Sequence, residues 1–97
     1  MLTSKQRKEL EALANSAETI FQIGKGGVNE NLITSVKEAL MSRELVKVAV
    51  LNNSELKAKE LIGELAQKTA AEPVAARGNK IILYKLSDKD GIRHLLS

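Results

Sequence analysis

The stretch TIFQIGKGGVNENLI, residues 19–33, sets a strand, a glycine loop and the start of a helix next to one another. Residues 19–23 are rich in β-branched and aromatic side chains and stop at Gly24, a pattern typical of a short β-strand. Asn29 suits the N-cap of the helix, because its side-chain oxygen can accept a hydrogen bond from a first-turn amide. The stretch therefore predicts a strand-to-helix connection through residues 24–27.

The residues before this stretch predict an opening helix from about Ser4 to Ala14. The segment Thr3-Ser4-Lys5-Gln6 fits a capping box, in which two side chains satisfy each other's backbone amides. Lys5 and Lys8 point away from the apolar side of this helix and Arg7 lies on its flank, which gives the helix a basic outer edge. Apolar residues recur at helical spacing and predict its buried stripe: Leu10, Leu13, Ala14 and Ala17.

The residues after this stretch continue the alternation of helices and strands. Residues 44–51 form a nearly continuous apolar run, typical of a strand covered on both faces. Residues 52–54 are polar and can cap a third helix. The second and third helices have apolar residues at steps of three and four: Leu32, Ile33, Val36, Ala39 and Leu40 in the second, and Ala58, Leu61, Ile62, Leu65 and Thr69 in the third.

The last part of the chain predicts a hairpin. Pro73 stands at the start of a strand over residues 74–77, where a strand tolerates proline. Gly78-Asn79 then separates this strand from an apolar run over residues 80–85, and a two-residue Gly-Asn link is a strong hairpin signal. Residues 87–97 predict only a short helix or a loosely packed tail.

These elements together predict a single compact α/β domain over residues 1–97. The predicted order is α-β-α-β-α-β-β, with three helices and a mixed four-stranded sheet. Strands joined through helices are expected to lie parallel, and the closing hairpin adds an antiparallel strand. A chain of 97 residues is long enough to bury a real core.

The composition excludes several classes of site. There is no cysteine and a single histidine, His94, which excludes disulfides, zinc ribbons, iron–sulfur clusters and sites that need two histidines. The only aromatic side chains are Phe21 and Tyr84, both expected in the core, whereas proteins that stack bases present several aromatic residues. The net charge of +3 is compatible with a polyanionic partner. Any nucleic acid is therefore expected to be held through its backbone phosphates and shape, without a metal or cofactor.

No stretch approaches the roughly 20 apolar residues of a membrane span, and the first ten residues are polar and charged. The sequence therefore predicts a cytoplasmic protein without a membrane partner.

The glycine loop Gly24-Lys25-Gly26-Gly27 is the sharpest candidate site. Glycines leave no Cβ to block a close approach to the backbone, so a phosphate can contact the loop amides directly. The helix that follows adds a partial positive charge at its N-terminus, and Lys25 adds a full one. Three attractions for one anion would thus converge at this loop, although a tight turn also explains its glycines.

More specific glycine motifs fit less well. A Walker A loop requires lysine followed by serine or threonine after its last glycine, whereas Val28 and Asn29 stand here. A dinucleotide-binding loop requires a small residue where Asn29 lies. The loop also has the G-x-x-G form with which KH modules clamp a nucleic-acid backbone, although there it joins two helices.

Four segments resemble, in order and spacing, the CRM domain of bacterial YhbY-like proteins and plant organelle splicing factors: Leu2-Thr3-Ser4-Lys5-Gln6-Arg7, Ile23-Gly24-Lys25-Gly26-Gly27, Glu44-Leu45-Val46-Lys47-Val48 and Gly78-Asn79-Lys80-Ile81-Ile82-Leu83-Tyr84-Lys85. The resemblance implies a fold similar to the C-terminal domain of a bacterial translation initiation factor. It also implies binding of structured RNA, without catalysis, and a partnership with the precursor of the large ribosomal subunit.

The resemblance maps the family's glycine loop onto Gly24 to Gly27 and its basic first-helix surface onto Lys5, Arg7 and Lys8. Lys80 and Lys85 are expected to extend this RNA-binding surface, and no DNA partner is expected. Lys85 departs from the family pattern, which usually has arginine after Leu-Tyr. Lysine keeps the charge and loses the bidentate fork of arginine.

Two other function classes stay open at this stage. The domain could be a protein adaptor on the ribosome that makes contact through Ile92, Leu95 and Leu96. It could also be an enzyme that uses the glycine loop for a nucleotide phosphate, although the sequence offers no catalytic group for such an enzyme. Acids such as Glu30 and Glu38 fall on a helix beside basic residues, as ordinary solvated charges do.

Overall fold

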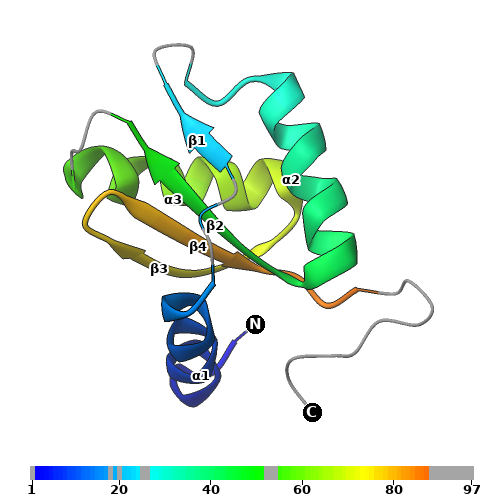
Figure 1. Cartoon of the computed structure of the whole chain (residues 1–97), viewed down its shortest axis with the longest axis vertical. Coiled ribbons are helices and arrows are strands. Elements are labelled where there is room, and N and C mark those ends of the chain that lie inside the picture. The colour runs from blue at the N-terminus through cyan, green and yellow to red at the C-terminus, as the bar shows by residue number, and fades with distance from the viewer. Residues whose placement is uncertain (1, 18, 20, 25–26, 52–54, 88–97) are drawn as a thin grey trace.

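The computed structural model describes residues 2–17, 19, 21–24, 27–51 and 55–87 (Figure 1). Its helices and strands alternate as predicted: α1 (Ser4–Asn15), β1 (Phe21–Ile23), α2 (Glu30–Arg43), β2 (Leu45–Val50), α3 (Glu55–Thr69), β3 (Glu72–Arg77) and β4 (Lys80–Tyr84). The chain is a single compact α/β domain, as expected. None of the helices in the described part is long and apolar enough to cross a membrane.

The four strands form one mixed sheet in the order β1-β2-β4-β3. β1 pairs parallel with β2, and β4 pairs antiparallel with both β2 and β3. β2 and β3 therefore run in the same direction although β4 lies between them, which agrees with the prediction for strands joined through helices. β3 is an edge strand with a register shift between Pro73 and Ala75, and both features explain why it tolerates proline.

The side of the sheet that faces α2 and α3 carries the larger core. Val46, Val48 and Val50 alternate along β2 and are all buried in this cluster, together with Ile81 and Leu83 of β4. Side chains from both helices complete it: Val36, Leu40, Ala58, Leu65 and Ala66. Because the intervening residues of β2 and β4 point to the opposite side, the same two strands also contribute to a second core.

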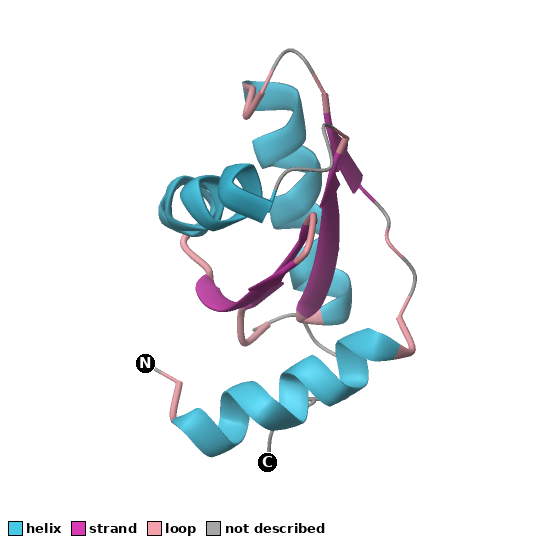
Figure 2. Cartoon of the chain, turned by 90° about the vertical axis from the view of Figure 1, so that its left-hand side faces the viewer, coloured by secondary structure: helices cyan, strands magenta, loops and turns pink. Residues whose placement is uncertain are grey.

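The second core lies between the opposite side of the sheet and α1, which Figure 2 shows apart from the other two helices. Leu10 and Ala14 are fully buried there, against Ile82 and Tyr84 of β4. Leu45 of β2 and Val74 and Ala75 of β3 complete this core, so α1 packs on three strands of the sheet.

Part of the apolar stripe predicted for α1 is wrong. Leu13 is 44% exposed, and Ala17 lies beyond the helix and is exposed. Successive residues are about 100° apart around a helix, so Leu13 projects to one side of the line through Leu10 and Ala14. Leu13 therefore lies outside the contact with the sheet.

Two predicted helix starts are confirmed by their hydrogen bonds. At α1, the Thr3 hydroxyl accepts from the Gln6 amide at 3.1 Å, and the Gln6 side chain accepts from the Thr3 amide at 2.9 Å. At α2, the Asn29 side chain accepts from the Leu32 amide at 2.9 Å. The cap predicted at residues 52–54 and most of the predicted tail, residues 88–97, lie outside the described residues.

Glu44 corrects the predicted start of the second strand, which was expected over residues 44–51. It is the C-cap of α2, in a left-handed conformation with φ 63°, and β2 begins one residue later. Glu44 is fully buried, and its carboxylate accepts a hydrogen bond from the Ser87 amide at 2.7 Å. Its backbone carbonyl accepts from the Lys85 amide at 2.9 Å. One acidic residue thus fastens the end of α2 to the segment that follows β4.

Tyr84 gives the fold a dependence on pH. Burial of the phenol, and secondarily the charge of Glu44, raise the pKa of Tyr84 above its ordinary value of 10.0. The unfolded chain therefore loses the phenol proton first, which favours unfolding. We expect the free energy of unfolding of the parent to fall more steeply above pH 10.0 than that of Tyr84→Phe, and to run parallel with it at lower pH. Urea unfolding at several pH values measures both, and parallel curves above pH 10.0 would contradict the assignment.

Candidate nucleic-acid interface

The predicted glycine loop lies where β1 ends and α2 begins, beside the end of β2. Gly24 and Gly27 are half-buried, and the Gly27 amide donates to the Gly24 carbonyl at 3.0 Å. Lys25 and Gly26, two of the predicted site residues, lie outside the described residues. The Gly27 amide is therefore already used within the turn and cannot also donate to a phosphate. Any contact between the loop backbone and an anion must come from the other loop residues.

The two described glycines have different reasons to be glycine. Gly27 adopts φ 65°, in the left-handed region where a side chain is strained. At Gly24 an added Cβ would lie 3.5 Å from a Leu51 methyl carbon, an ordinary contact distance. Neither backbone strain nor packing therefore requires a glycine at position 24. A ligand that approaches the backbone closely would require one.

Two side chains reduce the capacity of the α2 N-terminus, which follows the loop, to bind an anion. Asn29 takes the Leu32 amide, and the exposed Glu30 places an acid in the first turn. An anion bound there would meet the positive end of the helix dipole together with the charge of Glu30. The attraction of this helix end is therefore weaker than the sequence pattern alone predicts.

The β3–β4 hairpin turn lies at the same end of the sheet as the glycine loop. Asn79 brackets Val50: its carbonyl accepts from the Val50 amide at 2.7 Å, and its side-chain amide donates to the Val50 carbonyl at 3.0 Å. The Leu51 amide in turn donates to the Ile23 carbonyl at 2.9 Å, next to Gly24. Lys80, whose ammonium lies 3.3 Å from the Asn79 side-chain oxygen, is thus placed at the loop end of the sheet.

The other predicted basic residues lie elsewhere. Lys85 follows the opposite end of β4, about 16 Å from Lys80 along an extended strand. Lys5, Arg7 and Lys8 are exposed on α1, which packs at that far end of the sheet. Figure 1 shows α1 and the β1–α2 connection at opposite ends of the molecule. The structure therefore divides the predicted site residues into a loop group and a far group.

Two further basic residues lie between these groups, and the sequence pattern did not identify them as site residues. Arg77 forms a two-point ion pair with Glu11 of α1, at 2.6 and 3.3 Å, and this bond raises the pKa of Arg77. The Lys47 ammonium donates to the Ala14 carbonyl at 3.2 Å, where the partial negative charge at the end of α1 attracts a cation. The alternation of β2 marked Lys47 as opposite to the main core, but its neighbours depend on the strand order.

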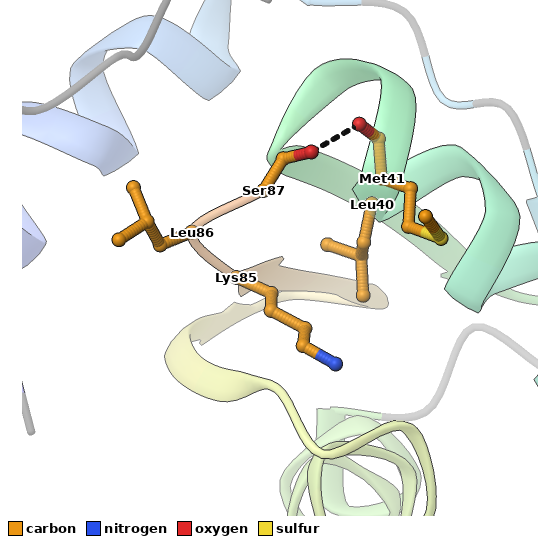
Figure 3. Close-up of a pocket in the computed structure, with 5 residues that line it drawn as sticks. All are labelled: Leu40, Met41, Lys85, Leu86 and Ser87. Atoms are coloured by element: carbon orange, nitrogen blue, oxygen red, sulfur yellow. Dashed lines mark hydrogen bonds between the residues drawn. The ribbon is translucent and has the colours of Figure 1, made fainter. Parts of the chain in front are cut away.

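A shallow groove of about 310 Å³ lies at the end of α2, lined by Leu40, Met41, Lys85, Leu86 and Ser87 (Figure 3). The Ser87 hydroxyl donates to the Met41 carbonyl at 2.5 Å, and Leu86 points away from Leu40 and Met41. Ile92, Leu95 and Leu96, the predicted adaptor contact, lie outside the described residues.

Among the described residues no cluster of three or more acidic or histidine side chains could hold a metal ion.

Comparison with known proteins gives the family. Residues 2–85 match the model of the CRS1 / YhbY (CRM) domain. The chain is 43% identical over 90 residues to the Bacillus subtilis protein named "Probable RNA-binding protein YqeI", covering 93% of this chain and 94% of the relative. It is 27% identical over 92 residues to a Haemophilus influenzae protein named "RNA-binding protein", covering 95% and 93% of the two chains.

A solved structure of similar sequence has the same fold. The solution structure of a hypothetical protein from Staphylococcus aureus, described as "a putative RNA binding protein", is similar with a TM-score of 0.81 and 44% identity, covering 93% of this chain and 94% of that one. The chain therefore belongs to the CRS1/YhbY (CRM) domain family, as its four characteristic segments indicated.

The contrast between the two described glycines can be tested by measuring the free energy of unfolding of an alanine variant at each position. Gly27→Ala places a side chain in the left-handed region and is expected to lower the free energy of unfolding by about 1 to 2 kcal/mol. Gly24→Ala is expected to stay within about 0.5 kcal/mol of the parent. Urea unfolding followed by circular dichroism measures both. Equal losses would show that Gly24 also has a structural role.

Proposed function

We propose that this protein binds structured RNA without catalysing a reaction, and that it does so through backbone phosphates. The observation that carries the proposal is the family relation: relatives that match over almost the whole chain are named for RNA binding. Those names describe binding alone, which favours a binding role over the nucleotide-dependent enzyme. The few aromatic residues agree with recognition of phosphates and shape, because Phe21 packs against the main core and Tyr84 is buried.

We propose the loop end of the sheet as the primary contact. Gly24 supports this choice, because the fold itself gives no reason for a glycine there. Lys80 lies at the same end, on the hairpin that Asn79 fixes to β2. Lys25 and Gly26 are included on the sequence pattern, and Lys5, Arg7, Lys8 and Lys85 form a more distant part of the surface.

We further propose that the RNA is ribosomal RNA in the precursor of the large ribosomal subunit, and that the protein acts in the cytoplasm. The family resemblance supports this partner. A protein that recognises phosphates and RNA shape also suits folded ribosomal RNA, which presents both over an extended surface.

Binding at the loop can be tested with Gly24→Ala. The added methyl group would hold a phosphate away from the backbone and remove a charge-assisted hydrogen bond, so the affinity for a ribosomal RNA fragment should fall roughly tenfold. Fluorescence anisotropy with a labelled fragment measures this affinity, and thermal unfolding confirms that the variant is folded. Unchanged affinity would remove the loop from the site.

The salt dependence tests phosphate recognition as a whole. Each phosphate neutralised contributes roughly 0.7 to 0.9 to the slope of log affinity against log salt. We expect a steep negative slope for the parent between about 50 and 200 mM salt. An affinity that stays flat over this range would contradict binding through phosphates. Crosslinking in cells, followed by sequencing of the bound RNA, tests the ribosomal partner separately.

A further inference from the structure

The sheet surface that faces α1 has a polar part beside the helix. α1 itself packs on Leu45 of β2, on Ile82 and Tyr84 of β4, and on Val74 and Ala75 of β3. Towards the loop end, the same surface carries the exposed Gln22 of β1 and the half-buried Lys80 of β4. This polar part of the surface therefore extends from α1 towards the loop end of the sheet.

Three cations gather on this surface. Arg77 and Lys80 are direct partners across the β3–β4 pairing, with Cβ atoms about 5 Å apart. Lys47 lies diagonally from Lys80, because its own partner is Ile82, two residues further along β4. Like charges directly opposite each other destabilise a sheet. Glu11 compensates the charge of Arg77, and the Lys80 ammonium donates to the neutral Asn79 side-chain oxygen at 3.3 Å.

The same cations connect the two groups of predicted site residues. Lys80 belongs to the loop group, and Arg77 stands beside it. Arg77 reaches Glu11, and Arg7 and Lys8 lie one helical turn before Glu11, about 5 to 6 Å away between Cβ atoms. A row of basic side chains thus runs from Lys80, at the loop end of the sheet, through Arg77 to the outer edge of α1. Glu11 of α1 forms an ion pair with this row.

The exposure of the Glu11–Arg77 ion pair allows another anion to replace Glu11 as the partner of Arg77. The Arg77 side chain is 71% exposed, while Glu11 is 25% exposed. An exposed pair of this kind is weak, since water and salt screen it. A phosphate presents the same planar pair of acceptor oxygens to a guanidinium as a carboxylate does, and it can therefore replace Glu11 without leaving Arg77 unpaired.

We propose that Lys47, Arg77 and Lys80 form a second phosphate-contacting surface for the RNA, continuous with the glycine loop, and that Glu11 competes with the RNA for Arg77. This inference rests on the proposed function and specifies which face of the domain the RNA follows. RNA that leaves the loop crosses the polar part of the sheet surface and reaches Arg7 and Lys8. Glu11 lowers the affinity because its bond to Arg77 must break first.

The test uses Glu11→Gln, with Glu64→Gln as its matched control. Glu64 forms an ion pair of 2.8 Å with Lys68 on α3, which packs on the opposite side of the sheet. Both substitutions add one unit of net positive charge and release one cation. Glu11→Gln should bind the ribosomal RNA fragment about two- to fivefold more tightly at low salt, the range of a weak surface pair. Glu64→Gln should leave the affinity unchanged.

Two further variants test Arg77 itself. Arg77→Gln should weaken binding and make the salt slope shallower by roughly 0.7 to 0.9. In that background Glu11→Gln should no longer increase the affinity. Equal gains from Glu11→Gln and Glu64→Gln, or a gain that persists without Arg77, would overturn the inference. Thermal unfolding of each variant confirms that it is folded.

The failure of this inference is distinguishable from the failure of the proposed function. If the parent protein binds no RNA at all, the proposed function fails. If the parent binds, and Gly24→Ala weakens binding while Arg77→Gln and Lys80→Gln do not, the RNA contacts the loop and avoids the sheet.

Discussion

The pairing of β2 with β4 is the interaction on which the rest of the structure depends. Both strands are buried on two sides, so their alternate residues supply both hydrophobic cores at once. Val48 and Ile81 face α2 and α3, whereas Leu45 and Ile82 face α1. A shift of this register by one residue would exchange the two sides and remove both cores together. The position of every helix follows from this one pairing.

The same pairing also places the candidate site. β4 brings Lys80 to the end of β2, and Asn79 fastens the hairpin to Val50 beside the glycine loop. At the other end of the pairing, Glu44 joins α2 to the segment after β4. The proposed basic surface is therefore built on the paired strands at the centre of the sheet. Recognition of RNA by shape, as we propose it, requires cations at such fixed spacings.

The structure limits the phosphate-binding role that we propose for the glycine loop. Gly27 is required by its positive φ, and its amide is used within the turn. Glu30 reduces the attraction of the helix end that follows. The remaining support for phosphate binding comes from Gly24, because neither backbone strain nor packing requires a glycine at this position. The proposed binding of an anion at this loop accordingly depends on nearby lysines such as Lys80, at the loop end of the sheet.

The order of residues along the chain was enough to predict the capping box at Thr3, the N-cap at Asn29, the Gly78-Asn79 hairpin and the family. These depend on neighbouring residues, whose chemistry can be read along the chain. It did not show that Glu44 is a left-handed cap, because a buried acid in an apolar run resembles a strand start. Nor did it place Arg77 against Glu11, 66 positions away. Only the tertiary structure decided these contacts, because the strand order brings distant segments together and no local pattern encodes that order.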